Sequence, residues 1–388
     1  MSVIRKTLIA FVFVVLGLVG YDLATHDRAA WQSDYSRLKQ GMAQGYANLD
    51  WQVEERDLDL AALDRETGEK IDKSFSRIQA YLALRDFIGA FRDPHLGLNF
   101  GDAPGYAALL PVESSVSPGT DCAQQGYENE DMATSLSYTQ HPDWQPLESH
   151  SFPIGTIGET GILRIAAFGE NKYSDACKSV ERSGLDGRGL QLATRAKLNE
   201  ELETALASLK EAGATRLVID VTGNGGGSEW IGEVAAMLSD RPLSRNAPLL
   251  ADARCDRSAI WAGETVCPIL TRTGERETVE GRGLWTGPIA LLIDNGSASA
   301  TEGFAVWLGD NDRAVLVGKR SFGAGCGYID GGSAVQLTAA PLHVLMPNCA
   351  RFTAAGVNEI EGIEPDIEAD LSTMSAEEFL PLFDRAFP

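Results

Sequence analysis

From residue 161 onward the chain alternates apolar runs of strand length with amphipathic runs of helix length. The strand-like runs are GILRIAAF, RLVIDV, PIALLID and RAVLVG, and the helical patterns between them include LATRAKLNEELETALASLKEAG, SEWIGEVAAMLS and SATEGFAVWLGD. A strand, a helix and a further strand in succession bring the strands side by side in a parallel or mixed sheet that the helices cover. We therefore expect an α/β fold whose core spans residues 155–372.

The segments around this core have a different character. Helical spacing of large apolar residues, beginning with Trp31, Tyr35 and Leu38, predicts a small helical domain over residues 28–100. Residues 101–154 are rich in Gly, Pro, Ser and acidic residues, which is typical of an irregular connecting segment. Residues 373–388 are expected to form a C-terminal helix or tail.

The N-terminus carries a targeting pattern. Arg5 and Lys6 precede an apolar run over residues 7–21, which is short for a membrane span and typical of a signal peptide. We expect residues 1–24 to be a signal sequence or an uncleaved membrane anchor, with the remainder exported to the periplasm or cell envelope. The alternative is a buried core helix.

The cysteine content agrees with export, and the net charge excludes one class of partner. The six cysteines are disulfide candidates, and they are Cys122, Cys177, Cys255, Cys267, Cys326 and Cys349. Pairing of neighbours along the chain is our expectation, most directly for Cys255 with Cys267, and the alternative is a set of free buried thiols. The sequence has no C-x-x-C pattern, and its formal charge of −22 argues against a nucleic-acid partner.

Two small-residue corners follow two of the expected strands. The first, DVTGNGGGSE over residues 220–229, presents backbone N–H groups suited to an anion, and it matches neither the dinucleotide fingerprint nor the P-loop. Asp220 is expected to end the strand and shape this turn. The second, NGSASATEG, places Ser299 at a helix N-terminus, where a serine is either a cap or a nucleophile. Parallel strands would open both corners on one edge of the sheet.

A nucleophilic serine needs a base, and the chain has five histidines. His26 lies beside the N-terminal run, His141 and His150 lie in the irregular segment, and His343 lies in a strand-like run. His95, in FRDPHLGLNF, closes the helical domain on a proline-containing turn and is the candidate base.

The motifs LVIDVTGNGGG, LLIDNGSASATEGFAVWLGDNDRAVLVGKRSFGAG and EGIEPDIE, in this order, resemble the S41 peptidases, which include the C-terminal processing proteases and their tricorn-like relatives. The resemblance covers about residues 155–370. It implies a ClpP/crotonase-like core and a serine nucleophile at Ser299. It also implies an oxyanion hole formed near Gly225, Gly226 and Ala300.

The chain departs from the processing-protease pattern in FGAG, where Ala324 replaces the lysine base and Tyr328 replaces a glutamine. The sequence RDPH instead resembles the histidine motif of the tricorn-like branch, which implies that His95 is the general base. That branch also implies Glu359 as the carboxylate that orients the histidine, with Glu361 as the alternative. The short interval after His95 leaves no room for a PDZ domain.

Two other charged residues have simpler interpretations. Lys319 is expected to be a solvated charge at a strand end, with a displaced base as the alternative, and Glu302 is expected to cap its helix. The resemblance thus implies an exported serine-type peptidase that acts on polypeptides. Such a peptidase is expected to need no metal or cofactor and to contact a membrane only through the N-terminal segment. The alternatives are an esterase and a non-catalytic protein that binds peptides or hydrophobic ligands.

Overall fold

The computed structural model describes residues 2–103, 121–182, 185–270 and 275–387. Residues 104–120, part of the connecting segment expected over 101–154, lie outside the described residues. The chain forms two compact units. The first, which we call the helical unit, takes residues 1–113, 249–272 and 327–350, and the second, the sheet unit, takes residues 114–248, 273–326 and 351–388.

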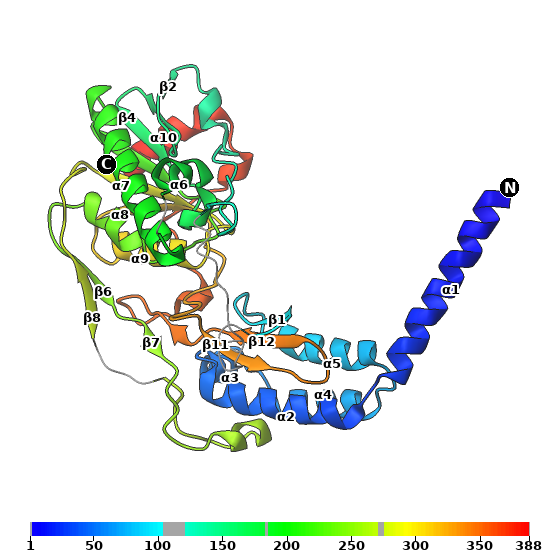
Figure 1. The fold of residues 1–388 in the computed structure, drawn as a ribbon. Coiled ribbons are helices and arrows are strands. Elements are labelled where there is room, and N and C mark those ends of the chain that lie inside the picture. Colours follow the sequence, from blue (N-terminus) through cyan, green and yellow to red (C-terminus); the bar gives the residue numbers. More distant parts are fainter. Residues whose placement is uncertain (1, 104–120, 183–184, 271–274, 388) are drawn as a thin grey trace. The chain divides into compact units, whose positions relative to one another are not determined.

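The sheet unit, in which Figure 1 labels β2 and β4, is built on a seven-stranded mixed sheet with the order β14-β10-β9-β5-β4-β3-β2. The strands β4, β5, β9, β10 and β14 are parallel to their neighbours, and β2 and β3 extend the sheet as an antiparallel edge. The strands of this sheet are β2 (Trp144–Leu147), β3 (Ile154–Ile157), β4 (Thr160–Arg164), β5 (Arg216–Asp220), β9 (Ile289–Ile293), β10 (Val315–Gly318) and β14 (Ile367–Glu368). A separate antiparallel pair joins β6 (Leu243–Asn246) to β8 (Arg276–Val279).

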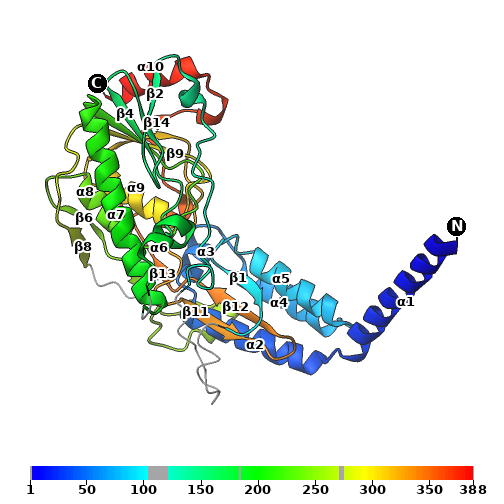
Figure 2. The same cartoon turned by 45° about the horizontal axis from the view of Figure 1, so that its top comes forward.

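Helices cover both faces of the large sheet, which explains the uninterrupted apolar sequences of its central strands. Leu217, Ile219 and Leu291 belong to the hydrophobic cluster that includes α7, α8 and α9, whereas Val218 and Leu292 belong to the cluster that includes α10. The helices α7 and α10 thus lie on opposite faces of the sheet (Figure 2). The helices of this unit are α6 (Ser174–Val180), α7 (Gly187–Glu211), α8 (Ile231–Met237), α9 (Ala300–Gly309) and α10 (Ala376–Ala386). The expected α/β fold is confirmed.

The order of the strands places the two small-residue corners together. β5 pairs with β9 in parallel, so the segments that follow Asp220 and Ile293 leave the same edge of the sheet. Asp220 is buried, and its carboxylate accepts hydrogen bonds from the backbone and the side chain of Thr222, as expected for a residue that shapes the turn.

The helical unit packs its helices with a three-stranded antiparallel sheet of order β1-β12-β11. Its helices are α1 (Ser2–Ala24), α2 (Arg28–Gly45), α3 (Leu49–Glu54), α4 (Leu60–Asp72) and α5 (Arg77–Gly89). Its strands are β1 (Gly97–Phe100), β7 (Leu249–Leu250), β11 (Ser333–Gln336), β12 (Leu342–Met346) and β13 (Cys349–Ala350). Asp27, Asp59 and Ser76 cap α2, α4 and α5, each accepting a hydrogen bond from a backbone N–H of the first turn.

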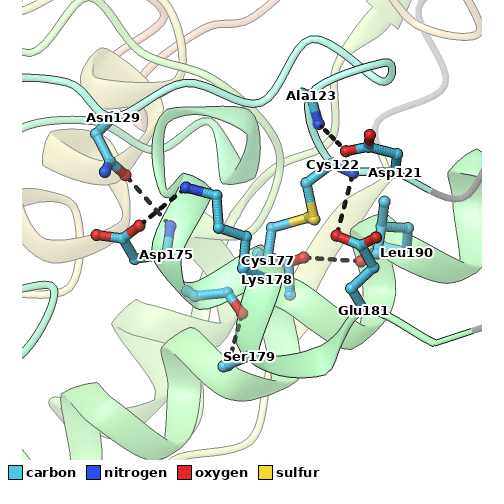
Figure 3. Close-up of a disulfide and its surroundings, with 12 residues drawn as sticks. Asp121, Cys122, Ala123, Asn129, Asp175, Cys177, Lys178, Ser179, Glu181 and Leu190 are labelled. Atoms are coloured by element: carbon cyan, nitrogen blue, oxygen red, sulfur yellow. Dashed lines mark hydrogen bonds and ion pairs between the residues drawn. A yellow bond between two sulfur atoms is a disulfide. The ribbon is translucent and has the colours of Figure 1, made fainter.

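Each unit contains a disulfide. Cys122 bonds to Cys177 of α6 in the sheet unit (Figure 3), and Cys255 bonds to Cys267 in the helical unit. The backbone N–H of Cys122 also donates to the carboxylate of Glu181, 3.4 Å away, beside the first of these disulfides. In the part of the chain that the structure describes, no cysteine is free.

The N-terminal targeting pattern coincides with α1. Over the ranges that are described, none of the helices has both the length and the apolar character that crossing a membrane requires.

Candidate active site

The serine corner has an unusual backbone. Ser299 is the N-cap residue of α9, with φ 57° and ψ −116°. Helix caps ordinarily have extended backbones, as Ser76 has at α5, with φ −143° and ψ 157°. A residue with a Cβ rarely adopts the conformation of Ser299, and the surrounding structure must hold it there. Ser299 is therefore more than an ordinary cap.

The Glu302 carboxylate binds the backbone of the serine corner. Its side chain is fully buried, and it accepts a hydrogen bond of 2.9 Å from the backbone N–H of Ser299. It accepts four more hydrogen bonds, 2.6–3.0 Å long, from the Ser321 hydroxyl and from the backbone N–H groups of Gly323, Ala324 and Gly325. Glu302 thus joins the serine corner to the FGAG segment, which the expectation of a simple helix cap did not include.

The glycine-rich loop contacts the serine corner directly. The N–H of Ala298 donates to the carbonyl of Asn224 over 3.0 Å, and the N–H of Gly223 donates to the Asp294 carboxylate over 2.7 Å. Gly226, at φ 102°, comes so close that a Cβ on it would lie 2.9 Å from Ser299 Cβ. The loop and the nucleophile candidate therefore form one packed arrangement.

Backbone donors remain available at this contact. The N–H of Gly226 donates to Asn224 Oδ1 over 2.9 Å, so it is already used. Within the described ranges, the N–H groups of Gly225 and Ala300 donate to no protein acceptor. Gly225 is exposed, and Ala300 is the first residue of α9. Backbone donors without an acceptor, one beside the serine and one in the loop that packs on it, suit an anionic oxygen.

Glu359 lies in a buried charged cluster that reaches the serine. It is fully buried, and its Oε2 accepts a hydrogen bond of 2.7 Å from Nε of Arg351. Its Oε1 has no hydrogen-bond partner among the described residues. Burial raises the pKa of Glu359, although the charge of Arg351 opposes the rise. Arg351 in turn donates to the Ser299 carbonyl over 2.8 Å, whereas the alternative carboxylate, Glu361, is exposed.

His95 belongs to the helical unit, in the turn between α5 and β1. Its backbone N–H donates to Asp93 Oδ1 over 2.9 Å, and its carbonyl accepts a hydrogen bond of 2.6 Å from the hydroxyl of Tyr328. The ring of Tyr328 meets the imidazole edge-on, with centroids 5.4 Å apart. Gly327 packs so closely that a Cβ on it would lie 2.8 Å from His95 Nε2. The imidazole is therefore closely packed on several sides.

Burial shifts the pKa values of two residues that contact His95. Burial raises the pKa of Asp93, which also accepts hydrogen bonds from Tyr46 and Asn48. Burial, and then the charge of Asp93, raises the pKa of Tyr328 to about 12. Tyr328 therefore keeps the proton that it donates to the His95 carbonyl throughout the neutral range.

Lys319 has the simple role expected of it. Its Nζ lies 2.8 Å from the Asp370 carboxylate, and both side chains are nearly half exposed. A surface ion pair of this kind contributes little to stability, and it engages the amine that a displaced base would need.

Three residues that contact the candidate site residues were not predicted from the sequence. Arg351 contacts Ser299 and Glu359, and Asp93 and Tyr328 contact His95. Arg351 lies in CARFTAA, a stretch with no recognisable motif. Asp93 is part of RDPH, and its position two residues before His95 could have indicated that its side chain binds the backbone of His95. Tyr328 was noted only as a replaced glutamine.

Comparison with known proteins identifies the family of the chain. Residues 159–369 match the sequence profile of Peptidase family S41. The chloroplastic carboxyl-terminal-processing peptidase 3 of Arabidopsis thaliana is 24% identical over 230 residues, which are 56% of this chain and 33% of the relative. The carboxyl-terminal-processing protease of Picosynechococcus sp. is 31% identical over 291 residues, 64% of each chain. The chain thus spans about a third of the Arabidopsis relative and under two thirds of the Picosynechococcus one.

Solved structures show the same fold at low identity. Mature CPAF in complex with lactacystin superposes with a TM-score of 0.64 at 16% identity, over 92% of this chain and 97% of that one. A putative peptidase from Parabacteroides merdae gives a TM-score of 0.58 at 13% identity, over 92% and 93% of the two chains.

Proposed function

Because this chain belongs to peptidase family S41, we propose that it is a serine-type peptidase with Ser299 as its nucleophile. One observation carries the proposal. Ser299 is held at φ 57° at the start of α9, next to Ala300 and packed against Gly226 of the glycine-rich loop, and among the described residues the N–H groups of Ala300 and Gly225 have no acceptor. In the proposed reaction the Ser299 hydroxyl attacks the peptide carbonyl, and these N–H groups stabilise the oxyanion. Loss of one such donor typically costs about 3–4 kcal/mol of transition-state stabilisation.

His95 is the proposed general base, which takes the Ser299 proton and delivers it to the leaving amine. The sequence supports this assignment, because RDPH resembles the histidine motif of the tricorn-like branch and FGAG offers no lysine base. Within its own unit, the His95 ring packs against Gly327 and Tyr328, which limits the orientations that the imidazole can take.

Glu359 is the proposed orienting carboxylate. Its buried Oε1 lacks a partner among the described residues, and an unpaired buried oxygen of this kind is costly unless a donor meets it. A histidine N–H is such a donor, and the pair would hold the imidazole tautomer and stabilise the imidazolium. The proposed groups are those of the Ser-His-Glu branch. A histidine base makes a lysine in FGAG unnecessary, which accounts for Ala324 at that position.

The pH dependence of Ser299 labelling tests which base is used. We expect the rate of reaction with a fluorophosphonate to fall on the acid side of its pH profile, where a protonated imidazole cannot accept the serine proton, and to be level on the alkaline side. A rate that keeps rising toward pH 10 would instead indicate an amine base such as Lys319.

The proposed substrate is a polypeptide. Hydrolysis of casein and of internally quenched peptides, compared with hydrolysis of p-nitrophenyl esters, tests this choice. Cleavage of peptide bonds that is lost in Ser299→Ala supports it. Turnover of esters alone would favour an esterase, and a protein that neither cleaves nor forms a fluorophosphonate adduct would favour a non-catalytic binding protein.

Export is the proposed route of the chain. The apolar run over residues 7–21 follows two basic residues, and disulfides persist in oxidising compartments. Fractionation of cells that express the full chain, with N-terminal sequencing of the product, tests this proposal. Recovery of reduced, full-length protein from the cytosol alone would contradict it.

The Cys122–Cys177 disulfide is expected to stabilise the fold. It closes a loop with a sequence separation of 55 residues, and its loss in a Cys122→Ala, Cys177→Ala variant should lower the free energy of unfolding by about 2–4 kcal/mol. Chemical denaturation measures this change. The Cys255→Ala, Cys267→Ala variant, which opens a loop with a separation of only 12, is the control and should lose less. Equal stability with and without the first disulfide would show that it has no such role.

A further inference from the structure

We propose that Arg351 and Glu302 are positioning residues that clamp Ser299 in its strained conformation by binding both of its main-chain groups. The catalytic half of this inference rests on the proposed peptidase function. The conformational half stands on the geometry of the sheet unit alone.

The clamp consists of two buried charges of opposite sign. The Glu302 carboxylate accepts from the N–H of Ser299 over 2.9 Å, and Nη2 of Arg351 donates to the carbonyl of the same residue over 2.8 Å. Both side chains are at least 97% buried. Hydrogen bonds to charged groups in a dry environment are stronger than neutral ones. Together they fix the peptide groups on both sides of the Ser299 Cα.

Arg351 is itself held at four points. In addition to Ser299, it donates to Glu359 over 2.7 Å, to Glu229 over 3.0 Å and to the Gly325 carbonyl over 3.3 Å. The planar guanidinium satisfies these acceptors from one position, which the compact ammonium of a lysine cannot do. Because the guanidinium is fixed in this way, its hydrogen bond restricts the position of the Ser299 carbonyl.

Gly325 connects the two halves of the clamp. Its N–H donates to Glu302 over 2.7 Å, and its carbonyl accepts from Arg351. Ser299 is bound in the same way, N–H to Glu302 and carbonyl to Arg351. The two charges thus hold the nucleophile residue and the FGAG segment in one frame, and this frame exists without a lysine in FGAG.

The kinetic test uses Arg351→Lys and Glu302→Gln in the full chain. We expect each variant to lower kcat for peptide hydrolysis by about 100-fold while KM changes by less than about threefold, because the clamp positions the nucleophile and does not bind substrate. The matched control is Arg245→Lys. Arg245 is equally buried and pairs with Glu229 and Glu277, but it donates to neither Ser299 nor Gly325, so its kcat should stay near that of the wild type. Equal losses of kcat in all three variants would overturn the positioning role.

The conformational test needs no activity. Glycine adopts the backbone of Ser299 without strain, so Ser299→Gly should raise the Tm by about 3 °C when Arg351 is present. In Arg351→Lys the released residue can relax, and Ser299→Gly should then raise the Tm by less than about 1 °C. The same cycle with Glu302→Gln serves if the lysine variant does not fold.

Equal gains in both backgrounds would overturn the clamp even if hydrolysis is normal. A wild-type protein without hydrolysis or labelling would instead overturn the proposed function, and the thermal cycle would still decide whether the clamp exists.

Discussion

Replacement of His95 by alanine is expected to lower kcat for peptide hydrolysis by a factor on the order of 10⁴ to 10⁶, because Ser299 would lose the base that activates it. Thermal stability should change little, since the imidazole is only partly buried and its loop remains held through Asp93 and Tyr328. Steady-state kinetics with a quenched peptide, together with a thermal melt, measure both quantities.

Lys319→Ala provides the control for this variant. Lys319 pairs with Asp370 at the surface, and its loss should leave kcat within about twofold of the wild type. The opposite ranking, with activity lost in Lys319→Ala and kept in His95→Ala, would identify lysine as the base and reject the Ser-His-Glu assignment.

Replacement of Gly226 by alanine should damage both stability and activity. At φ 102° the new Cβ would lie 2.7 Å from the Ala298 carbonyl oxygen, 2.8 Å from the Ala300 nitrogen and 2.9 Å from Ser299 Cβ. These atoms belong to the backbone and to the nucleophile, so the corner itself must move. We expect the free energy of unfolding to fall by about 2–4 kcal/mol. We also expect kcat to fall by about 100-fold or more.

The neighbouring glycine supplies a matched control. Gly225 does not have a positive φ, and a Cβ on it would meet no atom within 4 Å. In chemical denaturation, the free energy of unfolding of Gly225→Ala should therefore lie within about 0.5 kcal/mol of that of the wild type. If Gly226→Ala proved as stable as Gly225→Ala, the close packing of the loop on the nucleophile would be disproved.

The sheet could be predicted because its central strands contain continuous apolar runs. The LVI of RLVID and all of IALLI are buried, as is typical of parallel strands that helices cover on both faces. Their order along the chain then placed the two small-residue corners on one edge. By contrast, the composition of the helical unit could not be predicted, since β11 and β12 join it from residues 333–346. Pairing between such distant segments leaves no local pattern.

The sequence identifies candidate residues for the site but not the residues that hold them in place. Ser299 and the glycine-rich loop stand at positions that local sequence marks clearly. Gly226 was grouped with the donors, but its N–H is bound by Asn224. Glu302 was assigned as a helix cap because its spacing from Ser299 fits one, whereas its contacts with the FGAG segment depend on tertiary packing. Arg351 acts through a guanidinium at the end of a long side chain, and no spacing rule reveals where that group lies.

The roles of Ser299 as nucleophile and His95 as base are tested most directly by the site and rate of fluorophosphonate labelling, determined by mass spectrometry of the full chain. We expect one adduct, on the peptide that contains Ser299. It should be absent in Ser299→Ala and form on the order of 10³-fold more slowly in His95→Ala. An adduct on another residue, or an equal labelling rate with and without His95, would contradict it.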